Sequence, residues 1–520
     1  MPSYLTPGVY VEEVPSASKP IEGVGTSVAA FVGLAPGGPL NTPVQISNWT
    51  QFARTFGDPT RDDRSPYMTG AYLAYAVAGF FDNGGSMCWV VRVGGEAEGA
   101  RLAALPAAGE QGGDSLRVIA RADAEEPVAV ELSEETGDEE KGGKNGNGSS
   151  PATQTTYTVK VTSGDQEPEE FTGLTMAPGP QNVVTTVNAQ SKYVRLEEVN
   201  AALPDLRRPP AAGQYDLAKA NGGGVEAGAM TGDVARRTGI DGLAAIDEIT
   251  MLCVPDIMAF AANDDDVLRD LQGKMIAHCE NAGDRMAILD PPPGKLPSEI
   301  LEWRMNTAGY DSKFATFYYP WIEVMDPRSQ PIMVPPCGHV AGLWARVDTS
   351  RGVHKAPANE VVRRANGLGF QVTAAEQGDL NKNGINCIRA FPGRGIRVWG
   401  ARTLSSDPEW RYINVRRLVN FISESIMEGT QWAVFEPNDS RLWMQLRIST
   451  SNFLTRVWRD GALFGASPDQ AFYVKCDAET NPPDLVEAGQ VTVQIGIAPV
   501  KPAEFIVFRI SQFQVGAEGA

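Results

Sequence analysis

Residues 249–290 have the sequence ITMLCVPDIMAFAANDDDVLRDLQGKMIAHCENAGDRMAILD. ITMLCVPD at its start and RMAILD at its end are short apolar runs that predict buried strands. Between them, DVLRDLQGKMIAHCENAG repeats apolar residues with the period of a helix and ends at a glycine. A strand, a helix and a second strand in this order predict parallel strands joined by a crossover helix. The middle of the chain is therefore predicted to have an α/β fold.

The same alternation extends on both sides of this stretch. Apolar strands are predicted at 27–35 and 87–93, with helices at 51–57 and 68–85 between them. Further along, a helix at 297–309, a strand at 313–324 and a helix at 337–352 continue the pattern. Strands that alternate with helices predict a mostly parallel sheet covered on both faces. We assign this α/β domain to residues 23–93 and 239–378.

An insertion with a different composition, residues 94–238, separates the two halves of the α/β domain. From Asp123 to Glu140 it has nine acidic residues and no basic residue, and GGKNGNGSS follows at 142–150. A stretch of this composition cannot bury a core, which predicts a mobile acidic loop. On its far side, TYTVKVTSG and SKYVRLEEV alternate like solvent-facing strands. The insertion is therefore predicted to be a β-rich surface domain.

The last third of the chain predicts an α+β domain at 379–500. NCIRAFPGRGIRVWGARTL, residues 386–404, indicates two short strands around a Pro-Gly turn. Two helices are predicted after it, the first at 413–432 and the second at 441–463. The apolar face of the first helix is formed by Val415, Leu418, Val419, Ile422 and Ile426.

Both ends of the chain are predicted to be strands on tethers. Residues 1–22 form an N-terminal arm in which GVYVEEV lies between Pro7 and Pro15, and residues 501–520 form a C-terminal arm in which EFIVFRISQ follows Lys501-Pro502. Neither strand has an adjacent hairpin partner, so its backbone groups must pair elsewhere in the chain or on a neighbouring subunit. The residues expected to form these strands are Val9, Tyr10, Val11, Glu12, Phe505, Ile506, Val507 and Phe508.

Composition excludes several classes of protein. No stretch approaches the roughly 18 consecutive apolar residues of a membrane span, and the first residues lack the pattern of a secretory signal, so synthesis is expected to end in the cytoplasm. The net charge of −19 opposes nucleic-acid binding. The cysteines stand far apart without a CxxC pair, which favours buried thiols over disulfides or metal ligands.

Two short motifs resemble ligand-binding loops but lack required positions. PPPGK at 291–295 has neither the first glycine nor the Ser or Thr of a phosphate-binding loop. DLNKNG at 379–384 matches the start of a calcium-binding loop, but its twelfth position is Ala390 in place of a bidentate Glu. A polar turn is the simpler interpretation of the second motif, and neither predicts a cofactor or a metal.

The chain has three histidines, His278, His339 and His354, so any catalytic triad or zinc site must use one of them. None has a carboxylate or cysteine at the spacing of a zinc motif such as HExxH, and no GxSxG elbow is present. His354, in RGVHKAPAN, is the most interesting of the three, but a packing role is favoured over catalysis. No catalytic residue is predicted.

Several separated stretches resemble the tail sheath proteins of contractile phage tails, tailocins and extracellular contractile injection systems. They occur in the order expected of that family and cover the N-terminal arm, both α/β halves and the C-terminal domain. His354 stands where relatives often have Trp, and the acidic insertion lies outside the resemblance. The matching stretches are YLTPGVYVEEV, FVGLAPGGPLNTPVQISNWTQFARTFG, AVAGFFDNGGSMCWVVRV, RGVHKAPANE, INCIRAFPGRGIRVWGARTL and PEWRYINVRRLVNFI.

The resemblance implies a structural subunit that forms a six-fold helical sleeve around an inner tube, with a baseplate below and a cap above. The central domain of the family is called subtilisin-like, a likeness of fold alone, because the protease motifs are missing here. The terminal arms would donate strands to neighbouring subunits, and contraction would exchange one packing of subunits for another. The alternatives are a hydrolase that uses the α/β domain and a non-contractile binding or surface-array protein.

The second long helix of the last third is unusually basic for this acidic chain. Within residues 441–460 the four arginines Arg441, Arg447, Arg456 and Arg459 stand against the single acid Asp460. Leu454, Val457 and Trp458 can anchor the opposite face. We expect the arginines to face the inner tube, or alternatively to pair with acids of their own subunit.

Overall fold

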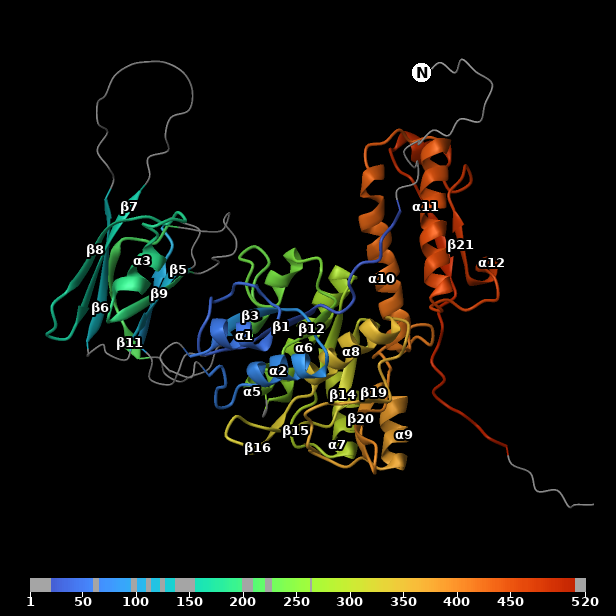
Figure 1. The fold of residues 1–520 in the computed structure, drawn as a ribbon, viewed down its shortest axis with the longest axis horizontal. Coiled ribbons are helices and arrows are strands. Elements are labelled where there is room, and N and C mark those ends of the chain that lie inside the picture. The colour runs from blue at the N-terminus through green and yellow to red at the C-terminus, as the bar shows by residue number, and fades with distance from the viewer. Residues whose placement is uncertain are drawn as a thin grey trace, which may run out of the picture. The chain divides into compact units, whose positions relative to one another are not determined.

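The computed structural model describes residues 20–58, 65–94, 101–108, 114–121, 127–135, 155–198, 209–219, 227–261 and 264–509. The chain divides into two units. One unit, here called the sheet unit, comprises Thr26–Ser350 and Pro357–Arg411. The other, here called the C-terminal unit, combines Met1–Gly25, Arg351–Ala356 and Tyr412–Ala520. The expected multidomain mixture of α/β and α+β structure is thus present (Figure 1).

A nine-stranded sheet forms the centre of the sheet unit. Its interior strands pair in parallel, from β3 through β1, β12, β13 and β14 to β19, and antiparallel strands close both edges. This agrees with the mostly parallel sheet expected from alternating strands and helices. In spatial order the strands are β17 (Glu360–Val361), β20 (Gly395–Val398), β19 (Ile385–Phe391), β14 (Ala315–Tyr319), β13 (Met286–Leu289), β12 (Met251–Cys253), β1 (Ala29–Leu34), β3 (Cys88–Gly94) and β2 (Val44–Ile46).

Helices cover both faces of this sheet, because successive residues of a buried strand point to opposite sides. In β1, Ala30 and Val32 belong to the core that also contains Leu268 and Met275 of one covering helix. Phe31 points the other way and meets Phe80 of another helix, with the two ring centroids 5.6 Å apart. Apart from one helix in the insertion, the α-helices that the structure describes in the sheet unit are α1 (Trp49–Phe56), α2 (Leu73–Asn83), α4 (Ala227–Thr231), α5 (Ile257–Ala261), α6 (Asp265–Ala282), α7 (Pro297–Glu302), α8 (Cys337–Arg351) and α9 (Ala374–Lys382).

Shorter elements complete the sheet unit. A 3₁₀ helix η2 (Asp241–Ala245) precedes β12, and a π-helical segment η3 (Trp303–Ala308) directly follows α7. A small antiparallel sheet contains β16 (Pro331–Val334), β15 (Ile322–Met325) and β18 (Gly367–Leu368). The strand predicted at 313–324 is therefore two strands in two different sheets.

Up to residue 219, the described residues of the insertion form two four-stranded antiparallel sheets and one helix around a core of their own, with Val130, Val159 and Leu196 among the buried residues (Figure 1). Helix α4 instead packs with the central sheet, where Met230 is buried. The insertion is β-rich, as expected. One sheet contains β10 (Gly213–Asp216), β6 (Val128–Glu135), β7 (Thr156–Ser163) and β8 (Glu169–Leu174). The other contains β11 (Ala218–Lys219), β4 (Arg101–Pro106), β5 (Asp114–Ala120) and β9 (Val194–Glu198), and the helix is α3 (Val183–Gln190).

The acidic stretch of the insertion differs from the mobile loop that its composition predicts. Residues 128–135 form β6, which pairs with β7 over eight residues. Val128, Val130 and Leu132 alternate with exposed or half-buried residues and are 1%, 1% and 2% exposed. Alternate residues of a strand point to opposite faces, so the apolar face of β6 is buried even though its other face is acidic. The rest of the predicted loop, at 123–126 and 136–150, lies outside the described residues.

The C-terminal unit is built on two long helices, α10 (Ile413–Thr430) and α11 (Ser440–Arg459), close to the predicted positions (Figure 1). Phe421 and Phe453 join them, with ring centroids 6.0 Å apart. On the predicted apolar face of α10, Leu418 and Ile422 are buried. The remaining elements are the 3₁₀ helix η4 (Gln431–Ala433), α12 (Pro468–Ala471), β21 (Phe472–Lys475), α13 (Pro483–Glu487) and β22 (Gln494–Ile497).

The boundary between the two units differs from the one expected at residue 379. Strands β19 and β20 lie in the nine-stranded sheet, where β19 pairs in parallel with β14. The sheet unit therefore continues to Arg411. Composition does not show this boundary, because the strand that pairs with β19 is more than 60 residues away in sequence.

Candidate assembly surfaces

The described part of the C-terminal arm, residues 501–509, has no regular secondary structure. It is held at its base, where the Asn414 amide donates a hydrogen bond to the Val500 carbonyl at 3.0 Å. The Tyr412 hydroxyl also meets the Glu504 carboxylate at 3.2 Å. The four apolar residues beyond this point are exposed, at 75% for Phe505, 73% for Ile506, 78% for Val507 and 83% for Phe508. Such a run of exposed apolar side chains is typical of a contact surface.

A small sheet lies in the same unit. Strands β21 and β22 pair antiparallel from Phe472–Ile497 to Lys475–Gln494. Phe472, Val474, Ile495 and Ile497 pack against the core of the long helices. No third strand pairs with this sheet among the described residues of the chain. A two-stranded sheet is marginally stable alone, and each of its edges is a place where another strand can add.

Helix α11 carries the four arginines predicted to face a tube, but they are not equivalent. Arg456 donates a hydrogen bond from its Nη2 to the backbone carbonyl of Ile21, within the same unit. All four arginines are exposed. Leu454 and Val457 are buried on the opposite face, as the helical pattern predicts. Arg456 therefore has a partner within its own unit, but that partner is a carbonyl and not the acid that the alternative expects.

The base of the N-terminal arm belongs to the core of the C-terminal unit. Ile21 is completely buried among residues of α10 and α11. The backbone N–H of Val24 donates to the Ser425 hydroxyl at 3.1 Å. Residues 21–24 were expected to be a free tether or the start of the α/β domain, because nothing nearby in sequence indicates what covers them. The predicted strand residues Val9, Tyr10, Val11 and Glu12 lie outside the described residues.

The three histidines are packed side chains. His339 is buried against Gly79, and burial lowers its pKa to about 4. The Nε2 of His278 lies 3.4 Å from Nη1 of Arg285, and burial, followed by the charge of Arg285, lowers the pKa of this imidazole to about 4. His354 is half-buried beside Gly352, and its backbone carbonyl accepts a hydrogen bond from the Asn414 amide. This packing of His354 agrees with the interpretation that favours a packing role over catalysis.

Two buried carboxylates lie directly after strands of the central sheet. Asp256 follows β12 and accepts a hydrogen bond from the Leu34 N–H at 2.7 Å. Asp290 follows β13 and accepts from the Cys337 N–H at 2.8 Å. Burial raises the pKa of Asp256 to about 6 and that of Asp290 to about 7. Both bind backbone groups that join strands to helices, which is a structural role.

The described residues contain no group of three or more His, Cys, Asp or Glu side chains that could hold a metal ion. The calcium-like motif begins inside α9, where Leu380 is buried, so its first residues cannot form a binding loop. The six cysteines are free and buried, as expected. No helix in the described part of the chain is long and apolar enough to cross a membrane.

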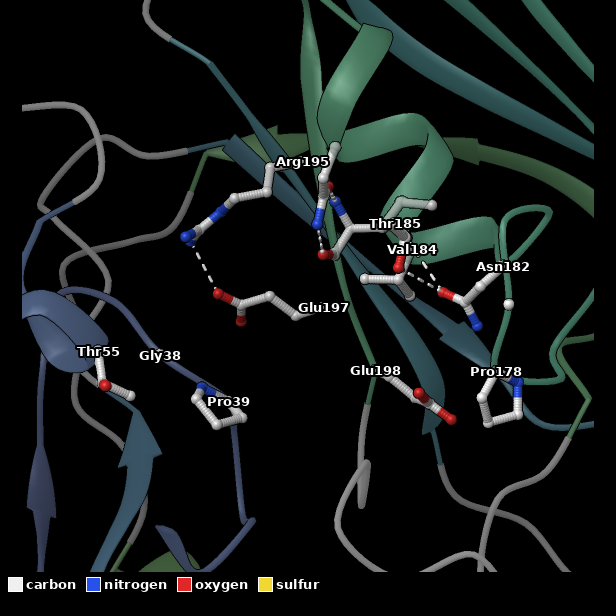
Figure 2. Close-up of a pocket in the computed structure, with 13 residues that line it drawn as sticks. Gly38, Pro39, Thr55, Pro178, Asn182, Val184, Thr185, Arg195, Glu197 and Glu198 are labelled. Atoms are coloured by element: carbon white, nitrogen blue, oxygen red, sulfur yellow. Dashed lines mark hydrogen bonds and ion pairs between the residues drawn. The ribbon is translucent and has the colours of Figure 1, made fainter. Parts of the chain in front are cut away.

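A cleft of about 470 Å³ lies between the insertion and the α/β body within the sheet unit (Figure 2). Glu197 of β9 binds Arg195 at 2.7 Å, and Figure 2 shows the two side chains facing each other. Glu197 also binds Arg92 of β3 at 3.2 Å, and the Arg92 side chain is completely buried. A buried carboxylate between two arginines therefore fastens the insertion to the central sheet.

The chain matches two models of one protein family. Residues 231–404 match the central domain of phage tail sheath proteins, and residues 405–513 match their C-terminal domain. Together the matches span a little over half of the chain. The chain belongs to the phage tail sheath protein family. The resemblance seen in the sequence is confirmed, and this family is one of structural proteins.

Curated relatives support the same assignment. The tail sheath protein of Salmonella phage ViI is 26% identical over 211 residues, which cover 40% of this chain and 32% of that protein. A putative prophage major tail sheath protein of Pseudomonas aeruginosa strain UCBPP-PA14 is 25% identical over 230 residues, covering 43% of this chain and 57% of the relative. The sheath chain thus spans between about a third and little more than half of these relatives.

Solved structures resemble the chain over nearly its whole length. A chain of the contracted sheath complex of the extracellular contractile injection system PVC is 22% identical, with a TM-score of 0.59, and the match covers 98% of this chain and 99% of that one. A chain of the anti-feeding prophage baseplate structure is 24% identical, with a TM-score of 0.56, and the match covers 98% of this chain and 100% of that one. These likenesses establish a sheath fold.

Proposed function

We propose that this chain is a structural subunit that polymerises into a contractile helical sleeve around an inner tube. Repacking of its subunits would drive ejection of the tube, without a catalytic site or a cofactor. The exposed apolar arm at residues 505–508, together with the two-stranded sheet in the same unit, is the observation that carries the proposal. An isolated subunit exposes both an apolar strand-forming sequence and sheet edges that can accept a strand, and a polymer can pair them.

Strand donation would link the subunits of the sleeve. Each arm, with Val9, Tyr10, Val11 and Glu12 at one end and residues 505–508 at the other, would add to a neighbour's β21–β22 sheet. An added strand that forms on the order of four backbone hydrogen bonds contributes about 1 kcal/mol for each. The link would persist while body-to-body contacts are exchanged during contraction.

Proline substitutions in the C-terminal arm test the proposal. Ile506→Pro with Val507→Pro removes two neighbouring backbone donors, so one donor facing the accepting sheet is lost whichever way the strand lies. We expect a folded subunit that forms no long tubes by negative-stain electron microscopy, with or without its tube partner. Ile506→Ala with Val507→Ala is the matched control, because it removes the same side chains and keeps both N–H groups. Normal tubes from the proline variant would contradict strand donation.

We further propose that α11 faces the inner tube through its exposed arginines. Each exposed charge pair contributes about 0.2 to 1 kcal/mol, so many pairs hold the tube only while the two geometries match. Because Arg456 binds Ile21, the test uses Arg441→Glu with Arg447→Glu. Empty sheath tubes should still form and co-assembly with the tube should fail. Normally filled particles would exclude this assignment.

The remaining partners follow from the same proposal. A sleeve of this kind would be six-fold, would start at a baseplate and end at a cap, and would be assembled in the bacterial cytoplasm as part of a phage tail or a related contractile particle. The baseplate and sheath structures that resemble the chain are consistent with such an assembly. A non-contractile array would instead give flat sheets in the microscopy experiment.

A further inference from the structure

A second cleft, of about 530 Å³, lies at one end of the central sheet of the sheet unit. Its wall includes Gly309–Asp311, which come shortly before β14, and Lys382–Gly384, which come directly before β19. Since β14 and β19 are parallel, both segments lie at the amino-terminal edge of the sheet. The π-helical segment η3 and residues 402–406 complete the wall.

The cleft is basic in an acidic protein. Arg304, Lys382, Arg402 and Arg411 line it, against the single carboxylate of Asp311. Two hydrogen bonds hold that carboxylate within the wall, from the Ser406 N–H at 2.8 Å and from the Ser406 hydroxyl at 2.5 Å. These bonds lower the pKa of Asp311 and keep it ionised. The wall therefore carries a net charge of about +3 in a chain whose net charge is −19.

Arg304 is the most unusual member of this wall. It is 7% exposed, and its guanidinium donates one hydrogen bond, from Nη2 to the Tyr310 carbonyl at 2.6 Å. Its Nε is buried without a partner, and no ion pair to Arg304 occurs within the described residues. Burial lowers the pKa of Arg304, and the nearby charge of Asp311 offsets this only in part, so the buried cation destabilises the subunit. Its position in a π-helical segment adds a feature often found at functional sites.

The location of the cleft favours a macromolecular partner over a small substrate. Open α/β sheets bind small molecules outside the carboxyl ends of their strands. In this sheet those ends carry Asp256 and Asp290, whose carboxylates bind backbone groups. The cleft lies at the opposite edge. A basic surface on that edge suits acidic side chains presented by another protein.

We propose that this cleft, here called the basic cleft, binds acidic side chains of a second copy of this chain. The inference rests on the proposed function, in which many copies pack side by side. With 64 acidic and 45 basic residues, the copies repel one another at long range. A cleft of the opposite charge supplies attraction in a defined position and thereby fixes how neighbours meet. Within the subunit the charge of Asp311 already acts on Arg304, and an acidic side chain of a neighbour would compensate this cation further.

The experiment compares two charge-reversal variants of the full chain. Lys382→Glu with Arg411→Glu reverses the accessible part of the basic cleft. Lys192→Glu with Arg328→Glu is the matched control, because these exposed cations lie outside the cleft and the change in net charge is identical. Sedimentation velocity at low and high salt measures self-association, pelleting measures the concentration needed for tube assembly, and circular dichroism checks folding.

We expect the cleft variant to need at least tenfold more protein for association at low salt, and the control to stay within about twofold of wild type. Equal behaviour of the two variants would overturn the proposal. If the cleft variant is poorly folded, Lys382→Gln with Arg411→Gln is tested in its place. We expect this variant to need about threefold more protein for association at low salt than wild type. Arg304→Met should weaken association in the same way while the melting temperature is kept or raised, which a purely structural arginine would not do.

Two further outcomes separate this inference from its alternatives. Titration of the wild-type monomer with inorganic pyrophosphate tests a small-anion site. Saturable binding that Lys382→Glu with Arg411→Glu abolishes would overturn the assignment to a protein partner.

If the wild type forms no tubes with or without its tube partner, the proposed function fails. Salt-dependent self-association, compared between the same two variants, still decides whether the basic cleft joins copies of the chain.

Discussion

The nine-stranded sheet and the C-terminal unit of this sheath protein differ in how far they bury their apolar side chains. In the nine-stranded sheet Phe31 and Phe317 are completely buried between layers of helices. In the C-terminal unit the apolar run at 505–508 remains exposed, and no third strand pairs with the two-stranded sheet among the described residues. The same kinds of side chain therefore serve two purposes. The first group stabilises the subunit, and we propose that the second is reserved for contacts between subunits.

The largest expected effect compares one phenylalanine from each group. Phe317→Ala should cost about 3 to 5 kcal/mol in the free energy of unfolding, since it removes a buried ring that stacks on Trp303. Phe508→Ala should change it by less than about 0.5 kcal/mol, because the side chain contacts mainly solvent in the monomer. Urea denaturation of both variants measures the difference. A large loss from Phe508→Ala would mean that the arm packs on its own subunit.

The next effect concerns the attachment of the insertion. Glu197→Gln keeps the size of the side chain but removes the charge between Arg92 and Arg195, at a cost of about 3 kcal/mol. Glu131→Gln, on an exposed position of β6, is the control and should be nearly neutral. Hydrogen exchange should show faster exchange in β3 and β9 of the first variant. Unchanged stability would place the attachment elsewhere in the chain.

A smaller effect separates two helical glycines. A Cβ at Gly338 of α8 would lie 2.2 Å from the Ala76 carbonyl oxygen of α2, so Gly338→Ala should cost about 1 to 3 kcal/mol. A Cβ at Gly273 of α6 would meet nothing within 4 Å, and Gly273→Ala should stabilise by about 0.5 to 1 kcal/mol. Thermal melts of the two variants should therefore shift in opposite directions. Equal shifts would contradict the close packing of α8 on α2.

A further effect is a dependence on pH. Burial raises the pKa of Asp290 from 3.8 to about 7, so the folded state holds this proton more tightly than the unfolded state. Its contribution to stability is complete below pH 3.8 and is lost as the pH rises through 7. Asp290→Asn should therefore gain stability relative to wild type between pH 5 and pH 7, by at most about 1.4 kcal/mol per pH unit. Parallel pH profiles would contradict the raised pKa.

Local patterns predicted the main strands and helices of the central sheet and the two long helices of the C-terminal unit. The apolar strand at 27–35, the helix at 266–283 and the two long helices of the C-terminal unit lie close to their expected positions. Strand β6 was missed because acidic composition outweighed its alternation, although Val128, Val130 and Leu132 already have the period of a strand. That alternation is the signal that could have found it.

The candidate sites also differ in how far the sequence predicts them. The exposed arginines of α11 and the apolar C-terminal arm are local features of sequence, and both were predicted from it. The basic cleft was not, since its cations come from segments about 100 residues apart that meet only through the pairing of β14 with β19. The partners of Arg92 and Arg456 are also distant in sequence, by 105 and 435 residues.

By itself the sequence determined the α/β alternation and the two long helices, because these depend on residues close to one another in the chain. It also showed no recognisable catalytic or metal motif, and it showed the likeness to tail sheath proteins through motifs that follow one another in order along the chain. The tertiary structure alone decided that β19 and β20 complete the central sheet, that Glu197 fastens the insertion, that Ile21 belongs to the C-terminal core and that four cations share one cleft. Contacts of this kind depend on which segments the folded backbone brings together, and neither composition nor periodicity records that information.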